Sequence, residues 1–340
     1  GDDGSESIIK CGSYTGNGST NGPEIDLGFE PQWLMVKNST ASSDWYLVDT
    51  MRGFTANTSD SYQRLMANLS NAEDGSNAFS INSTGFKLVN ATYNPNVSGN
   101  TYIYIAIRRP MKTPESGTEV FKPNDVDNGA SKPDSLSGFP VDMYFRRYVN
   151  TTNDTYLLTR LTSPNALKTN GTDAEAAFST ASAGFDYQNG VMNIFSSDNS
   201  DFHTWMFKRA TGFFDVVAYS GTSVAGSKNH NLGVVPELMF VKRRSLGGGQ
   251  GWNVYAAPLG NTSFITLNTN QSAFTGQSVW NSTTPTDSVF YLNTDAEVNS
   301  SSYTYVAYLF ATLAGVSKVG TYTGTGADLN VDCGFSAGAR

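Results

Sequence analysis

Histidine, the side chain most often used as a general base, occurs only twice in this sequence of 340 residues, as His203 and His230. A serine or cysteine nucleophile needs such a base within hydrogen-bond reach, and the base needs a third group that orients it. Neither histidine lies in a recognisable catalytic motif. We therefore interpret both as polar turn residues or packed side chains, and we predict no catalytic residues and no enzyme activity.

Two oxygen-rich loops are the candidates for a metal site. One contains Asp125 and Asp127, and the other contains Asp198 and Asp201. Calcium needs six to eight oxygen ligands, and neither loop has the spacing of an EF-hand. Weak calcium binding at these four aspartates therefore stands beside the simpler interpretation of solvated turns. The sequence has no closely spaced cysteine or histidine ligands for zinc, and we expect no cofactor.

Two carboxylates, Glu115 and Glu119, lie in a proline-rich stretch. A glycosidase needs two carboxyl groups held a few ångströms apart across a cleft, and this stretch has no feature that indicates a concave face. We interpret the pair as solubilising residues of a connector. The glycine-rich run 247–251 has no following lysine, so we expect a flexible loop there and no phosphate site.

Tryptophan side chains are the candidates for sugar contacts, because an exposed aromatic ring can stack on a pyranose. Trp45 and Trp252 occupy matching strand positions, which favours a place in the core. Trp280 has no such counterpart, so we predict that it is exposed and contacts a glycan. The fourteen Asn-x-Ser/Thr sequons are interpreted as a result of the composition, with glycosylation as the second possibility.

The elements that position these residues follow from the composition. Only 15% of the residues are charged and 12% are aromatic, with many Tyr, Thr, Val and Gly, which favours strands and turns. The net charge of −8 argues against nucleic acid as a partner. No apolar run approaches the length of a membrane span, so we expect no membrane insertion. The two cysteines, Cys11 and Cys333, are too few for a disulfide framework.

A long internal repeat organises the chain. Similar blocks with a Tyr-Thr-Gly or Tyr-Ser-Gly core surround Tyr14, Tyr219 and Tyr322, which are 205 and 103 residues apart. The first interval is about twice the second, so we expect a divergent copy in between. A period near a hundred residues is too long for a solenoid or propeller blade and suits small domains in tandem.

Each copy contains short runs of alternating apolar residues between Gly, Asn and Ser clusters, as β-sandwiches do. We predict an all-β fold of tandem β-sandwich units, jelly-roll or lectin-like, of about 100 residues each. The predicted boundaries are repeat 1 at 8–109, an extended connector at 110–138, a divergent repeat 2 at 139–209, repeat 3 at 213–312, and the first strands of an incomplete repeat 4 at 316–340. We expect that the polypeptide continues or that these last strands complete a neighbouring subunit.

The repeated blocks resemble a family of uncharacterised repeat domains in virion proteins of tailed phages, common in marine phages. The run from Gly12 to Lys37 carries the resemblance most clearly. The connector 107–121 and the blocks 212–219, 230–237 and 315–335 are similar to the same family. The resemblance implies a virion surface or appendage protein, such as a fibre or a decoration, and it implies no catalytic or binding residues.

The sequence therefore predicts a structural subunit of an extracellular assembly, most simply a phage virion. It would act through contacts with copies of itself or with other virion or filament subunits. A glycan-binding adhesin or receptor-binding module on a host cell surface is the second interpretation, and a polysaccharide depolymerase is the third. A virion or extracellular location follows from the first two.

Overall fold

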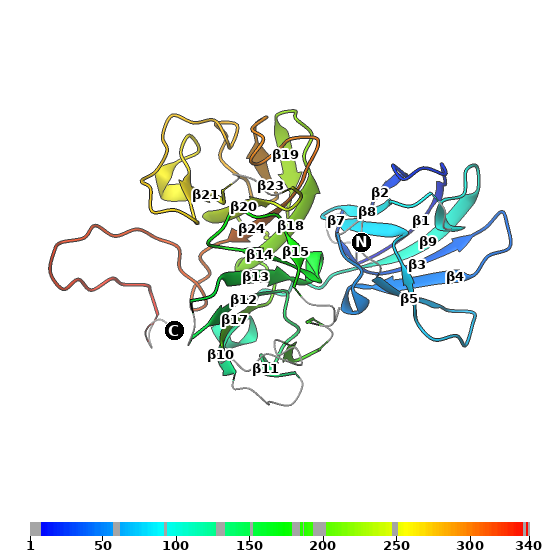
Figure 1. The fold of residues 1–340 in the computed structure, drawn as a ribbon, viewed down its shortest axis with the longest axis horizontal. Helices are drawn as coiled ribbons and strands as arrows, with labels where there is room; N and C mark the ends of the chain where they lie inside the picture. The colour runs from blue at the N-terminus through cyan, green and yellow to red at the C-terminus, as the bar shows by residue number, and fades with distance from the viewer. Residues whose placement is uncertain are drawn as a thin grey trace. The chain divides into compact units, whose positions relative to one another are not determined.

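The computed structural model is an all-β protein (Figure 1). Within the described residues the regular structure is β-strand and short 3-10 helix, and no helix there is long and apolar enough to cross a membrane. The chain divides into an N-terminal unit, with Gly1–Pro110, Thr159–Pro164 and Ser179–Tyr187, and a C-terminal unit, with Met111–Leu158, Asn165–Phe178 and Gln188–Arg340. The described residues are 8–56, 62–91, 94–126, 133–149, 152–178, 184–185, 187–192, 202–246, 251–335 and 338.

Repeat 1 consists of two antiparallel sheets. In spatial order, its main sheet contains β1 (Ile9–Thr15), β9 (Thr101–Arg108), β3 (Pro31–Asn38), β4 (Trp45–Asp49), β5 (Tyr62–Met66) and β6 (Asp74–Ser76). Its second sheet contains β2 (Glu24–Asp26), β8 (Gly85–Leu88) and β7 (Phe79–Asn82). Alternate side chains of the main sheet, such as Leu34 and Tyr104, are buried between the sheets, and Tyr104 packs edge-on against Phe86 of β8.

Repeats 2 and 3 have the same plan. The main sheet of repeat 2 contains β10 (Phe121–Val126), β17 (Phe202–Phe207), β12 (Met143–Tyr148), β13 (Thr155–Thr159), β14 (Asn165–Lys168) and β15 (Ala176–Ala177), and its second sheet contains β11 (Ser135–Leu136) and β16 (Gly190–Val191). The main sheet of repeat 3 contains β18 (Phe214–Ser220), β24 (Thr304–Phe310), β20 (Leu238–Arg243), β21 (Asn253–Ala256) and β22 (Ile265–Thr266), and its second sheet contains β19 (Gly226–Asn229) and β23 (Val289–Leu292).

The three main sheets share one strand order, in which the first strand of the repeat lies beside its last strand. In each repeat a 3-10 helix follows the fourth strand of that order: η1 (Thr50–Arg52), η4 (Arg160–Thr162) and η5 (Ala257–Leu259). The remaining 3-10 helices are η2 (Asn94–Asn96) and η3 (Gly117–Glu119). This arrangement confirms the predicted all-β class with sandwich-like domains.

The stretch 110–138 is not only a connector, as the sequence had suggested. It contains η3 and two strands, β10 and β11, and β10 pairs with β17 from Phe121↔Phe207 to Val126↔Phe202. Repeat 2 therefore begins near residue 121 and not at 139. β10 carries Pro123, which an edge strand tolerates because one of its two sides needs no ladder hydrogen bonds.

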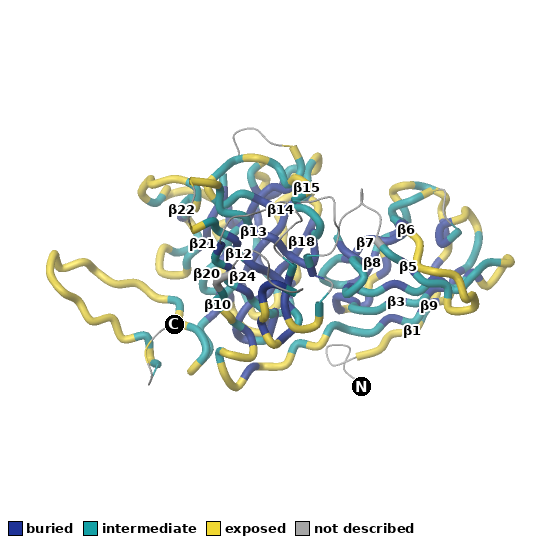
Figure 2. The backbone as a smooth tube through the Cα atoms, turned by 60° about the horizontal axis from the view of Figure 1, so that its bottom comes forward, coloured by how far each residue is buried: buried dark blue, intermediate teal, exposed yellow. Residues whose placement is uncertain are grey.

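The segment 316–335 also differs from the prediction. The first strands of a repeat were expected there, yet the described residues 316–335 contain no strand and are mostly exposed (Figure 2). Tyr322 is 73% exposed, whereas its counterparts Tyr14 and Tyr219 are buried. The turn that corresponds to the one between β2 and β3 is nevertheless formed, because the Gly334 amide donates to Asp332 Oδ1 as the Gly28 amide donates to Asp26 Oδ1.

Candidate functional site

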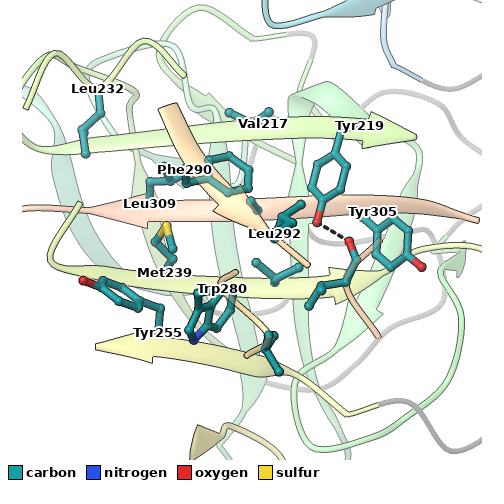
Figure 3. Close-up of a cluster of buried hydrophobic side chains, with 14 of the residues drawn as sticks. Val217, Tyr219, Leu232, Met239, Tyr255, Trp280, Phe290, Leu292, Tyr305 and Leu309 are labelled. Atoms are coloured by element: carbon teal, nitrogen blue, oxygen red, sulfur yellow. Dashed lines mark hydrogen bonds between the residues drawn. The ribbon is translucent and has the colours of Figure 1, made fainter. Parts of the chain in front are cut away.

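Trp280, predicted to be an exposed glycan contact, lies in the core of repeat 3 (Figure 3). The side chain is 1% exposed, its Nε1–H donates to the carbonyl of Ser263 at 2.9 Å, and its ring packs edge-on against Tyr255. The prediction is wrong because a buried ring cannot stack on a sugar. Among the described residues of repeat 3 no strand corresponds to β7, and Val279 and Trp280 supply the buried apolar side chains before β23 that β7 supplies before β8.

The calcium candidates are not brought together by the described structure. Asp125 lies in β10, where its backbone pairs with that of His203. Asp127, Asp198 and Asp201 lie outside the described residues. In the part of the chain that is described, no three His, Cys, Asp or Glu side chains form a group that could hold a metal ion. Calcium binding at these loops stays a prediction.

The carboxylate Glu119 has a structural role at η3. Its Oε1 accepts hydrogen bonds from the amides of Glu115 and Ser116, and Ser116 completes the capping box. The sequence signal was Ser-x-x-Glu, the pattern of such a box. A Gly-x-Ser-x-Gly string at 334–338, which is typical of hydrolase nucleophiles, does not follow a strand here, and Ser336 lies outside the described residues.

His230 is buried in repeat 3 with a defined tautomer. Its Nδ1 accepts from the amide of Leu232 at 3.2 Å, so Nε2 carries the proton and donates to the carbonyl of Thr286, also at 3.2 Å. A second proton on Nδ1 would face an N–H group. Burial lowers the pKa of His230, which agrees with a neutral, structural imidazole.

We expect the stability of the C-terminal unit to fall as the pH drops from 7.5 to 5.5. Because burial lowers the folded-state pKa of His230, the unfolded chain takes up a proton at a higher pH, near 6.5, and protonation favours unfolding. Urea midpoints at the two pH values measure the effect. His230→Gln should reduce the pH dependence relative to the native chain; an unchanged slope in this variant would contradict the assignment.

The repeated tyrosines fix the two sheets of a repeat at one end. In repeat 1, Tyr14 stacks on Tyr102 with a centroid distance of 5.1 Å and donates to the carbonyl of Pro95 at 2.8 Å. In repeat 3, Tyr219 stacks on Tyr305 at 5.3 Å and donates to the carbonyl of Val298 at 2.8 Å. The same geometry in both repeats shows that these tyrosines serve packing.

Two buried asparagines complete this arrangement. Asn96 Oδ1 accepts from the amide of Asn17 and Asn299 Oδ1 from that of Thr222, and each Nδ2 donates to two loop carbonyls. Both asparagines belong to sequons, yet each is only 1% exposed. In the folded chain they are structural residues that no glycan can reach.

The outer faces of the main sheets, turned away from the second sheets, are the candidate interaction surfaces. In repeat 3 one row crosses all five strands: Val216, Tyr308, Phe240, Val254 and Ile265. Within the C-terminal unit this face packs against repeat 2: Phe207 of β17 lies 5.7 Å from Phe214 and 6.2 Å from Phe310 between ring centroids. Repeat 2 thus covers most of the outer face of repeat 3, whereas Phe145 and Trp205 on the outer face of repeat 2 are only partly buried.

Polar groups tie these two faces together. Arg244 forms a bidentate pair with Glu175, with both N–O distances 2.9 Å, and Trp252 Nε1–H donates to the carbonyl of Lys168. Lys242 donates to the carbonyl of Thr172, and burial lowers the pKa of Lys242 to about 8. Lys242 and Arg244 are 1% and 2% exposed, so these contacts are largely shielded from water.

The corresponding face of repeat 1 is not covered. The row equivalent to that of repeat 3 is Cys11, Ile105, Met35, Leu47 and Leu65. Cys11 is exposed, the other four are partly exposed, and neighbouring rows add Ile9 at 55% and Ile103 at 43% exposure (Figure 2). We call these rows the outer face of repeat 1; it consists of Ile9, Cys11, Ser13, Trp33, Met35, Lys37, Trp45, Leu47, Asp49, Leu65, Ile103, Ile105 and Ile107.

The sequence carried a signal for this surface. Trp33-Leu34-Met35-Val36 of β3 is apolar at every position, and β9 is nearly so. Strict alternation is typical of a strand with one wet face, whereas a continuous apolar run is typical of a strand that is covered on both faces. Such runs in repeat 1 predict a cover for the outer face as well as the inner one.

Comparison with known proteins gives one family. The model of a domain of unknown function, DUF7483, matches residues 6–110 and 126–337 of the chain. No curated protein is similar to it.

Proposed function

The chain belongs to the family of the domain of unknown function DUF7483, and from that premise we propose that it is a structural subunit of an extracellular assembly. It acts through contacts between subunits and catalyses no reaction. The assembly we propose is a phage virion, with the chain as a surface, fibre or decoration protein; the resemblance of the repeated blocks supports this. Its partners are copies of itself or other virion subunits, not nucleic acid or the membrane interior.

One observation carries the proposal: the apolar outer face is largely buried against repeat 2 in repeat 3, whereas in repeat 1 it leaves Ile9, Cys11 and Ile103 exposed. A large exposed apolar patch on a folded domain is typical of an interaction surface. The repeated tyrosines and asparagines support the same role, because in repeats 1 and 3 they make the same buried packing and hydrogen-bond contacts to the loop before the last strand.

The glycan-binding role remains the second candidate, and one groove favours it. An open pocket of about 600 Å³ in the C-terminal unit is lined by amide and hydroxyl side chains around Leu267. Amides and hydroxyls hydrogen-bond to sugar hydroxyls, and an apolar side chain can contact a sugar ring. The lining residues are Thr169, Asn170, Leu267, Asn268, Thr269 and Asn270.

Electron microscopy of the protein in its source, with antibody labelling, separates the two roles. We expect the label on a repeating lattice, a fibre or a virion appendage. Label found only on dispersed single particles, outside any larger assembly, would overturn the structural role. In that case a glycan array becomes the informative measurement, with Asn170→Ala and Asn268→Ala as the variants that should lose the signal.

A further inference from the structure

The C-terminal unit shows how two outer faces of this fold pair. The outer face of repeat 3 packs against repeat 2, with Phe207 of β17 against Phe214 and Phe310. Most of the outer face of repeat 3 is therefore buried: Val216 is 1% exposed and Tyr308 is 0% exposed. Sheet faces of this family of repeats are therefore complementary to one another.

The outer face of repeat 1 has the same construction. Its central row crosses five strands, which at about 4.8 Å between neighbours spans about 19 Å. The side chains on it are mainly Ile, Met, Leu and Trp, which gain most from burial.

The charges on the outer face of repeat 1 favour pairing with itself. Among the outer-face positions of β1, β9, β3 and β4, two carry charge, Lys37 and Asp49. The Lys37 amino group already donates to the carbonyl of Ser43, and Asp49 is paired with Arg52 at 2.8 Å. Two copies of this face can approach without repulsion, although the chain as a whole carries a net charge of −8.

We propose that the outer face of repeat 1 binds the same face of a second copy of this chain, sheet against sheet. The inference rests on the proposed function and names the partner for one of its subunit contacts. A two-fold axis places the same patch on both sides of such an interface, so the near-neutral, apolar character of the face is the property that the contact requires. Ile105 and Met35, in the central row, would lie inside the interface.

The test is the oligomeric state of the full chain, measured by analytical ultracentrifugation over a range of concentrations. We expect a dimer for the native sequence and a dimer weaker by on the order of 100-fold for Ile105→Lys, since each interface would bury two unpaired ammonium groups. Val224→Lys, at a site 66% exposed in repeat 3, is the matched control and should leave the dimer intact.

A second readout does not depend on a variant. Cys11 lies on the outer face and is exposed in the single chain, whereas Cys333 lies outside that face. We expect alkylation of Cys11 to slow as the protein concentration rises, while that of Cys333 stays constant. A native chain that is monomeric at 100 µM, or a dimer that Ile105→Lys does not weaken, would overturn the proposal.

The two proposals fail separately. If labelled assemblies form in the source, and form equally well with Ile105→Lys, the proposed pairing of repeat 1 is contradicted and the structural role is not. If the protein occurs only as free particles but forms a dimer that depends on Ile105, the structural role is contradicted and the pairing is not.

Discussion

Replacing Asp215 with alanine is expected to lower the free energy of unfolding of the C-terminal unit by about 3–5 kcal/mol, the usual cost of removing one partner of a buried ion pair. Asp215 Oδ1 lies 2.6 Å from Arg209 Nε, and the two side chains are 0% and 3% exposed. Its second oxygen accepts from the amide of Asn231 at 2.8 Å. Alanine removes the charge that balances a guanidinium in the protein interior.

Urea unfolding of the full chain, followed by tryptophan fluorescence, measures this change. Asp328→Ala is the control, because Asp328 is exposed and a surface substitution changes stability by about 0.5 kcal/mol or less. The double variant Asp215→Ala, Arg209→Met should be more stable than Asp215→Ala alone, since it no longer buries a charge. A loss below about 1 kcal/mol for Asp215→Ala would mean that water reaches the pair.

The ion pair lies where the chain passes from β17, the last strand of repeat 2, to β18, the first strand of repeat 3. Its loss would therefore affect both repeats. The backbone amide of Arg209 donates to Asp142 of repeat 2, while its side chain binds Asp215 of repeat 3. One residue of the short joint thus contacts acidic groups from both repeats. These contacts hold repeat 2 and repeat 3 together at the point where the chain passes from one to the other.

Much of this fold is readable in the sequence for a physical reason. Short apolar runs between turn residues favour strands, and such runs recur at matching positions of repeats 1 and 3, so Trp33–Lys37 and Tyr102–Ala106 are each recognised as strands by pattern and by repetition. β10 is missed because it lacks the Tyr-Thr-Gly motif and contains Pro123, a residue that disfavours central strands. Its position at the sheet edge, which permits the proline, is a tertiary property that no local pattern contains.

The candidate surface was missed for a related reason. Sequence reasoning looked for single residues with reactive or stacking side chains, and chose Trp280 because it had no counterpart in repeat 1. The absence of a counterpart reflected a missing strand, which Trp280 replaces in the core. The surface that is uncovered consists of ordinary apolar residues such as Ile105, whose exposure depends on which sheets pair.

Gly16→Ala and Gly221→Ala are each expected to lower the free energy of unfolding by about 1–3 kcal/mol, the usual cost of adding atoms to a packed site. A Cβ on Gly16 would lie 2.4 Å from the carbonyl oxygen of Val97, and one on Gly221 would lie 2.1 Å from that of Ser300. Each obstacle is backbone, in the loop that precedes the last strand of its repeat, so relief requires the loop to move. That movement would disturb the tyrosine and asparagine contacts beside it.

Gly324→Ala provides the control, because Gly324 stands at the same place in the third Tyr-Thr-Gly motif, but a Cβ added there would have no neighbouring atom within 4 Å. We expect no loss of stability for this variant in the same urea experiment. A loss as large as that of Gly221→Ala would mean that 316–335 is packed in solution as the first strand of a sheet. Equal, small effects at all three glycines would instead contradict the backbone contacts in repeats 1 and 3. The glycine holds the same position in a Tyr-Thr-Gly or Tyr-Ser-Gly motif at all three places, so a difference in stability measures the packing around it.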